Sequence, residues 1–167
     1  MTAALELSTN QVTYFYSRDK NTGQMLKLLD VLLAQYAECE TLYLSWDAAS
    51  WHDSHALHAR VESVNAGTYR PGQKVPRVVL VPLPSRAQFL NVIESVFSGM
   101  ARAIIHSSDY DSVDAAQRAI DRYFRVRNEH FRLQPKRAGK KIWGEEPAPS
   151  EFSPGSNCKD PRWSRER

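Results

Sequence analysis

Residues 42–52 read LYLSWDAASWH, a largely apolar run that is broken by a carboxylate at Asp47. A short apolar run of this kind indicates a buried β-strand, which we place at residues 41–46. A second apolar run, RVVLVPL at residues 77–83, predicts another buried strand, and the two suit a parallel sheet covered on both faces. Ligands of open α/β sheets collect beyond the carboxyl ends of the strands. Asp47 is therefore well placed for chemistry.

The rest of the chain alternates between strands and helices. Residues 3–8 and 11–17 predict a hairpin around Thr9 and Asn10, because both stretches are rich in β-formers and the break is short and polar. Residues 54–66 are weakly helical, 66–76 are rich in turn formers, and helices are expected through 89–104 and 112–128. An amphipathic helix after the turn at 21–23 is predicted from the spacing of Met25, Leu28, Leu29, Leu32, Leu33 and Tyr36. The order ββαβ(α)βαα indicates an α/β fold.

Length and composition bound the protein class. A chain of 167 residues with 42% hydrophobic and 25% charged residues can form one domain with a substantial core. No apolar run approaches the roughly 20 residues that cross a bilayer, and the first residues lack a signal-peptide pattern. Cys39 and Cys158 are far apart and fit free thiols in a reducing compartment. We expect a cytoplasmic protein with a domain at 1–144 and an extended, proline-rich tail at 145–167.

Positive charge is concentrated in one block. Residues 118–141 hold nine Lys and Arg against two acids, whereas residues 1–117 carry more acids than bases. The block interleaves Arg with Tyr123, Phe124 and Phe131, a combination that can neutralise phosphates and stack on bases. The alternative is a solvated helix whose aromatic side chains face the core. The candidate DNA-binding residues are Arg118, Arg122, Arg125, Arg127, Arg132, Lys136, Arg137, Lys140 and Lys141.

A second carboxylate is expected near Asp47. Glu94 lies at the start of the helix that follows the 77–83 strand, at the same edge of the sheet. Two converging carboxylates tolerate each other when a divalent cation lies between them, and Mg²⁺ takes one or two carboxylates together with water and phosphate. Either acid alone also fits a purely structural role, as a cap or as a partner of the helix dipole.

Two other kinds of site have weaker support. The spacing of His52, Asp53, His55 and His58 matches no strong zinc signature, and exposed or capping histidines explain it better. Ser50 near His52 is no better as a hydrolase pair, because the chain has no GxSxG nucleophile elbow.

The stretches LYLSWDAASWH and LPSRAQFLNVIE resemble motifs of DDE transposases of the bacterial IS630 and eukaryotic Tc1/mariner group. There the second acid follows a strand in a pattern like LDNAxxH, and the last lies in LPxYSPxLNPIE. The resemblance covers roughly residues 3–144, and the basic helix and the NCKDPRW of the tail also look like the family's C-terminal part. The positions that fit are Asp47 and His52 in the first motif, and Leu83, Pro84, Leu90, Asn91, Ile93 and Glu94 in the second.

This resemblance implies a ribonuclease H-like fold, a mixed sheet flanked by helices. Its active site would use carboxylates, here Asp47 and Glu94, to hold two Mg²⁺ (or Mn²⁺) ions that activate the attacking oxygen and stabilise the leaving one. The implied partner is double-stranded DNA, at transposon ends and target sites, and the implied setting is the bacterial cytoplasm near the nucleoid. No membrane partner is implied.

The departures from the family pattern are substantial. Ala48 replaces the usual Asn, Arg86 and Ala87 stand where Tyr and Ser are expected, and the positions of two prolines hold Gln88 and Val92. The spacing from Asp47 to Glu94 is also longer than usual, which we attribute to the 56–76 segment.

A larger departure is that the sequence opens with the hairpin. The family's first strand, which carries the first catalytic Asp, lies between the equivalents of the 3–8 and 41–46 strands and is not recognisable here, nor is the helix-turn-helix that precedes it. None of the upstream acids Glu6, Asp19 and Asp30 occupies that first-strand position. We expect a sheet truncated at its N-terminal side and little strand cleavage by this chain alone.

Three functions remain open after this comparison. The chain is part of a DNA strand-transfer enzyme completed by an N-terminal transposase segment or a second transposase subunit, or a DNA-binding or regulatory remnant that uses the 118–141 block, or an inert fragment. An upstream reading frame that encodes a helix-turn-helix and a strand ending in Asp would favour the first.

Overall fold

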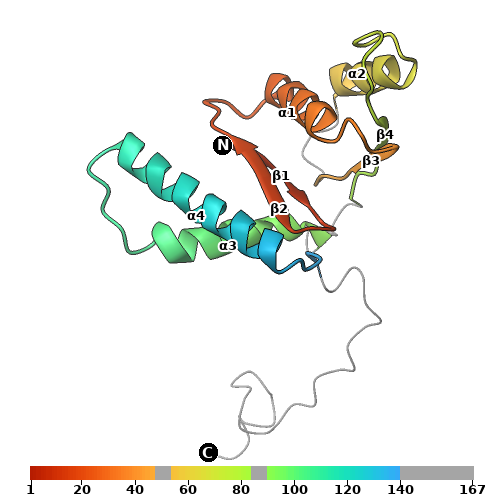
Figure 1. Cartoon of the computed structure of the whole chain (residues 1–167). Helices are drawn as coiled ribbons and strands as arrows, with labels where there is room; N and C mark the ends of the chain where they lie inside the picture. Colours follow the sequence, from red (N-terminus) through yellow and green to blue (C-terminus); the bar gives the residue numbers. More distant parts are fainter. Residues whose placement is uncertain (48–53, 84–89, 140–167) are drawn as a thin grey trace, which may run out of the picture.

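The computed structural model describes residues 1–47, 54–83 and 90–139. Over these ranges strands and helices mix, so the predicted α/β class is correct (Figure 1). The predicted tail at 145–167 lies outside the described residues. The elements follow in the order β1 (Thr2–Glu6), β2 (Gln11–Phe15), α1 (Thr22–Gln35), β3 (Thr41–Leu44), α2 (His55–Asn65), β4 (Arg77–Leu80), α3 (Val92–Ile104) and α4 (Val113–Leu133).

The strands β1 and β2 form the predicted antiparallel hairpin, with Leu5 opposite Val12. Asn10 makes the turn with a φ of 61°, a left-handed conformation that Asn adopts more readily than most residues. Its N–H donates to the carbonyl of Glu6 at 2.8 Å. The strand β1 therefore ends at Glu6, because the backbone bends into the turn from there.

The strands β3 and β4 pair in parallel, with Leu42 opposite Val78, and α2 lies in the connection between them. The prediction of two fully buried strands is only partly right. Leu42, Leu44 and Trp46 pack into the core on one side, whereas the Tyr43 side chain on the other side is 70% exposed. Alternate residues of a strand point to opposite faces, and within the described residues the face of Leu42 and Leu44 packs into the core while the face of Tyr43 is open.

The helix α1 begins at Thr22, inside the Asn-Thr-Gly turn after which it was expected. Asn21 is its N-cap, and the Asn21 side chain accepts a hydrogen bond from the N–H of Gln24 at 3.1 Å. The apolar stripe of α1 forms one core with α2 and the β3–β4 pair. The buried members of this first core are Met25, Leu28, Leu29, Leu32, Leu33, Trp46, Leu57, Val61, Val64 and Val78.

The helices α3 and α4 form a second core against the other face of the hairpin. Its buried members are Val12, Val96, Met100 and Phe124, and Phe124 is fully buried. The hairpin thus has two covered faces: Ala4 and Phe15 pack on the first core, and Ala3 and Tyr14 pack on the second. Figure 1 shows the hairpin between α1 and the α3–α4 pair.

The described strands do not form the single mixed sheet that the sequence predicts. The strand β1 pairs with β2 alone and β3 with β4 alone, which gives two separate two-stranded sheets. In Figure 1 the hairpin and the β3–β4 pair lie apart. Among the described helices, none combines the length and apolarity needed to cross a membrane.

Candidate metal and nucleic-acid site

The first candidate ligand, Asp47, follows β3 as predicted. It comes three residues after Leu44, and its side chain is partly buried. Asp47 lines a cavity of about 450 Å³ together with Asn91, Val92 and Ile93, which lead into α3. The end of β3 and the beginning of α3 therefore meet at one place.

The second candidate ligand, Glu94, lies in the first turn of α3. Its side chain is exposed, and the Asn91 side-chain amide donates to Glu94 Oε1 at 3.2 Å. A carboxylate in this position is also favoured by the helix dipole. Glu94 itself does not line the cavity, and the structure brings Asp47 to the start of α3 beside Asn91, Val92 and Ile93.

The described residues contain no group of three or more His, Cys, Asp or Glu arranged to hold a metal ion. The prediction of a metal site thus rests on Asp47 and Glu94 alone; Mg²⁺ in proteins takes one or two carboxylates and keeps several water ligands. Of the histidine cluster considered for zinc, His55 and His58 lie exposed on α2, while His52 and Asp53 fall outside the described residues, as does Ser50.

The cavity beside Asp47 runs as a groove between β1 and β3, over α1. We call it the β1–β3 groove. Its wall residues on β1 include Ala3 and Leu5, those on β3 include Tyr43, and its floor includes Leu28 and Leu32 of α1. Neither β2, apart from Thr13, nor β4 contributes to the lining. The groove therefore separates the unpaired edges of the two sheets.

The end of the groove opposite Asp47 is polar. Tyr36 donates to Glu6 Oε2 at 2.8 Å, and Ser8 donates to Glu6 Oε1 at 2.6 Å. Burial alone would raise the pKa of Glu6, but these donated hydrogen bonds outweigh it and lower the pKa. Burial and the neighbouring Glu6 carboxylate raise the pKa of Tyr36. Glu6 is thus a fixed negative charge at neutral pH.

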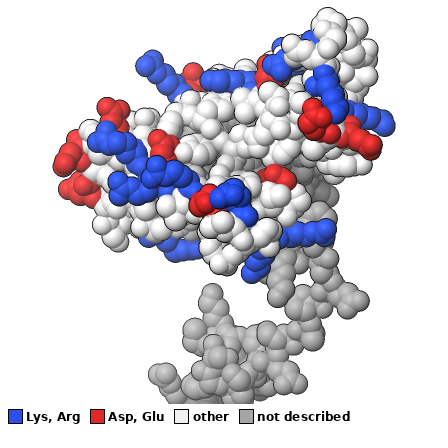
Figure 2. Space-filling view, in the orientation of Figure 1, with Lys and Arg blue, Asp and Glu red and all other residues white. Residues whose placement is uncertain are grey.

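The basic block forms most of α4 and the segment after it. Arg118, Arg122 and Arg125 are exposed along the helix, and Lys136 and Arg137 are exposed after it. In Figure 2 blue side chains lie over α4, with acidic side chains beside them. The predicted residues Lys140 and Lys141 lie outside the described part of the chain.

Two of the predicted DNA-binding arginines already have protein partners. Arg127 donates to the backbone carbonyl of Asn10 at 2.6 Å and also to the Asn10 side chain, and its guanidinium lies 4.8 Å from the centre of the Phe131 ring. Burial lowers the pKa of Arg127. Arg132 forms an ion pair with Glu129 at 2.7 Å. Arg127 holds the hairpin turn, so it is less suited to phosphate than its exposed neighbours.

Most aromatic side chains of α4 pack against the core, as in the alternative interpretation of a solvated helix with its aromatic residues facing inward. Phe124 is fully buried in the second core, and Tyr123 packs against the same core. The prediction of base stacking is therefore wrong for Phe124, because the helix turns this ring towards Tyr14 of the hairpin, whereas Tyr123 lies beside Gly99 of α3 and is only partly buried. Phe131 is partly buried beneath Arg127.

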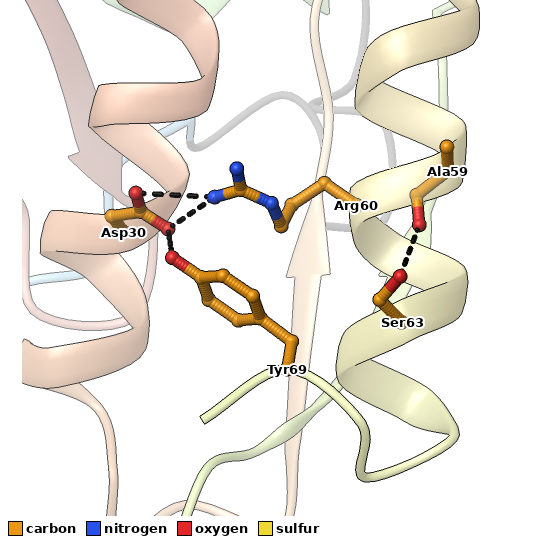
Figure 3. A network of polar contacts seen from close by, with 5 residues as sticks. All are labelled: Asp30, Ala59, Arg60, Ser63 and Tyr69. Carbon is orange, nitrogen blue, oxygen red and sulfur yellow. Dashed lines mark hydrogen bonds and ion pairs between the residues drawn. The ribbon is translucent and has the colours of Figure 1, made fainter. Parts of the chain in front are cut away.

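Sequence reasoning missed a polar network that joins α1 to α2. Arg60 contacts both Asp30 oxygens at 3.0 and 3.2 Å, and Tyr69 donates to Asp30 at 2.7 Å (Figure 3). The Arg60 guanidinium also stacks 4.2 Å from the centre of the Tyr69 ring. On α2, Ser63 donates to the carbonyl of Ala59 at 2.9 Å (Figure 3). Asp30 is bonded to both Arg60 and Tyr69, so the network anchors the 66–76 loop to α1 and α2.

Comparison with known proteins adds no assignment: no family model, no curated protein and no solved structure matches the chain.

Proposed function

We propose that the chain is part of a ribonuclease H-like nuclease domain of the DDE transposase type, which acts on double-stranded DNA. One observation carries this proposal: the groove lies between β1 and β3 and ends at Asp47. From the resemblance to the transposases we expect a strand at the position of this groove, between the 3–8 and 41–46 strands. We also expect the second acid directly after the second of these strands, where Asp47 lies.

In this proposal Asp47 and Glu94 hold divalent metal. Bound Mg²⁺ would activate the attacking oxygen and stabilise the leaving oxygen of a DNA phosphodiester. Asp47, at the end of β3, would position the ion relative to the sheet, and Glu94 would bind it from the first turn of α3. Two carboxylates are fewer than the three of the family, so the described residues alone should bind metal without cleaving DNA.

The metal site can be tested by nuclear magnetic resonance with Mn²⁺ as the probe. Substoichiometric Mn²⁺ should broaden the amide signals of both Asp47 and Glu94, because one ion bound by both carboxylates relaxes nuclei near each. Asp47→Asn should weaken broadening at Glu94 by about tenfold or more, since changes in the outer shell of a metal site already cost about 10- to 100-fold in affinity.

The exposed Asp19 provides the control for this experiment. Asp19→Asn removes the same charge and should leave the broadening at Glu94 unchanged. Broadening at only one of the two acids, or no effect of Asp47→Asn, would show that the carboxylates do not share an ion.

The second candidate function is DNA binding without catalysis. It is favoured by the exposed positions of Arg118, Arg122 and Arg125 along α4, which need no metal to contact phosphate. DNA binding that persists in Asp47→Asn together with the loss of the shared metal signal would separate this function from the first. The absence of both DNA and metal binding would leave an inert fragment.

A further inference from the structure

The backbone hydrogen bonds of the hairpin show which groups of β1 face the groove. Asn128 of α4 occupies the outer edge of β2: the N–H of Val12 donates to Asn128 Oδ1 at 2.9 Å, and Asn128 Nδ2 donates to the Val12 carbonyl at 2.8 Å. The backbone N–H and carbonyl of Val12 therefore point away from β1. The backbone N–H and carbonyl of its partner Leu5 likewise point away from β2. In an antiparallel ladder the direction of these backbone groups alternates from one residue to the next. The N–H and carbonyl of Ala3, two residues before Leu5, therefore also point away from β2.

One contact supports this assignment. Leu7 follows Leu5 by two residues, so its backbone groups are expected to point the same way as those of Ala3 and Leu5. The Leu7 carbonyl accepts a hydrogen bond from the N–H of Ala138 at 2.8 Å, on the side away from β2. On the groove side of β1, the Leu7 carbonyl therefore already has a partner from this chain. The backbone groups of Ala3 and Leu5 make no comparable bond within the described residues.

The same reasoning applies to β3. Carbonyls of Glu40, Leu44 and Trp46 accept from backbone N–H groups on the β4 side of the sheet, at 2.9, 2.8 and 2.9 Å respectively. The backbone N–H and carbonyl groups of the even-numbered residues of β3 therefore point to β4. Those of the odd-numbered Tyr43 and Ser45 point away from β4. Both line the groove.

The groove thus carries a row of backbone donors and acceptors on each wall. Within the described structure these rows have no partner from the opposite strand, because β1 and β3 do not pair. The floor between them is apolar and formed by α1. The buried indole N–H of Trp46, also in the lining, has no hydrogen-bond partner in the described structure. Buried polar groups are normally paired, so this arrangement fits a ligand that supplies hydrogen bonds along two edges.

We propose that the β1–β3 groove binds one extended β-strand from a separate polypeptide, which joins the two sheets into a single five-stranded sheet. A strand offers backbone donors and acceptors on both of its edges, which matches the two walls. This inference rests on the proposed function only for the role of the completed sheet, which would support the nuclease site. The groove geometry stands without it.

Charge and shape indicate the sequence of the bound strand. Its middle should be apolar, because the lining is formed by residues such as Leu5, Leu28 and Leu42. Its two ends should be basic. Glu6 lies at one end of the groove, beside Tyr36, which precedes β3, and Asp47 lies at the other end, after β3. The segment 145–167 of this chain is a poor occupant, because its four prolines remove strand donors.

The test uses the full chain and a synthetic peptide with the run Val-Ile-Val-Leu-Val between flanking lysines. Amide hydrogen exchange is measured with and without the peptide. Binding should slow exchange at Leu5 and Tyr43 by about tenfold or more, because both N–H groups become paired. Exchange at Val12, which is already bonded to Asn128, should change far less. A peptide of the same sequence with alternate N-methyl groups lacks one bonding edge and should not bind.

Two variants of Tyr43 provide the matched control. Tyr43→Pro removes the groove-facing N–H but no hydrogen bond to β4, and should weaken peptide binding by about tenfold or more. Tyr43→Ala removes the exposed side chain and keeps the N–H, and should bind like the wild type. Where Tyr43→Pro fails to fold, the N-methylated peptide still tests the same hydrogen bonds.

Several results would overturn the proposal. These are unchanged exchange at Leu5 and Tyr43, equal binding of the N-methylated peptide, or protection of both amides in the chain alone. In the last case, loss of protection on dilution would identify a second copy, and loss on deletion of 145–167 would identify the tail. Glu94→Gln removes a proposed metal ligand that does not line the groove and should bind the peptide normally, so a failed metal site and a failed strand site give different results.

Discussion

At the scale of single residues, α4 holds the hairpin through side chains that replace backbone pairing. The Asn128 amide pairs with both backbone groups of Val12, and the neighbouring Arg127 holds Asn10 in the turn. A helical Asn reads from sequence as a solvated residue, and an Arg in a basic block reads as a phosphate contact. Neither role was predictable, because the partners lie more than a hundred positions away and follow no local period.

The first prediction concerns Asn128. Asn128→Leu should lower the free energy of unfolding by about 1–3 kcal/mol, because it leaves the N–H and carbonyl of Val12 without partners at the edge of β2. Urea denaturation followed by circular dichroism measures the loss. Arg125→Leu, on the exposed side of the same helix, is the control and should change stability little. Equal stability of the two variants would show that water replaces the Asn128 amide at no cost.

A second residue-scale prediction concerns the tyrosines on Asp121. Tyr14 and Tyr16 both donate to Asp121 Oδ1, at 2.7 and 2.8 Å. Burial, with the nearby Asp121 carboxylate, raises the pKa of Tyr14 to about 12 and also raises that of Tyr16. The folded state holds these protons more tightly, so the stabilisation is complete below the ordinary tyrosine pKa of about 10 and is lost as the pH rises towards 12.

Ultraviolet titration of the tyrosinates should detect this shift. Asp121→Asn keeps an acceptor but removes the charge, and should move the pKa of Tyr14 back towards 10. Asp114→Asn, in the first turn of the same helix, should leave it unchanged. An unaltered titration in Asp121→Asn would assign the shift to burial alone.

At the scale of elements, local signals placed most of the fold. The stripe from Met25 to Tyr36 and the turn at 21–23 predicted α1, and the apolar runs predicted β3 and β4 as parallel strands. These succeed because helix and strand periods are local properties. The exposure of Tyr43 was missed, because an apolar run does not show which of its faces a helix will cover.

The helix α4 makes the element-scale prediction. Exposed arginines on it should bind duplex DNA with an affinity that falls steeply with salt, since each neutralised phosphate releases counterions. Arg122→Glu with Arg125→Glu should weaken binding and reduce the slope of log affinity against log salt by about 2. Fluorescence anisotropy of a labelled duplex measures both quantities.

The control for this experiment makes the same charge change elsewhere. Arg18→Glu with Lys20→Glu lies in the exposed loop before α1 and should leave the slope unchanged. A salt-independent affinity, or equal losses in the two double variants, would mean that α4 acts only as a helix surface and that net charge explains the binding.

At the scale of the whole molecule, the carboxylate site and the sheet share one weakness. Asp47 is attached to the β3–β4 pair, whereas Glu94 belongs to α3, which packs on the hairpin. These two parts meet at the β1–β3 groove and have no strand pairing across it. The geometry of any shared metal site therefore depends on how firmly the two parts are held together. Sequence could indicate both acids but not this dependence, which arises from long-range packing.

The last prediction is that the two parts open separately. Within the described residues the β3–β4 pair has no strand partner at the groove, so it is joined to the hairpin by side-chain packing around α1 and not by backbone hydrogen bonds. Native-state hydrogen exchange in low denaturant should give a lower opening free energy for the Val81 amide, which bonds to Leu44 across the β3–β4 pair, than for Phe124 in the second core. The apolar peptide with lysine ends should bring the two values together by joining the sheets. A single opening free energy for both amides in the chain alone would show that packing through α1 already couples the two cores and that the open groove leaves the fold intact.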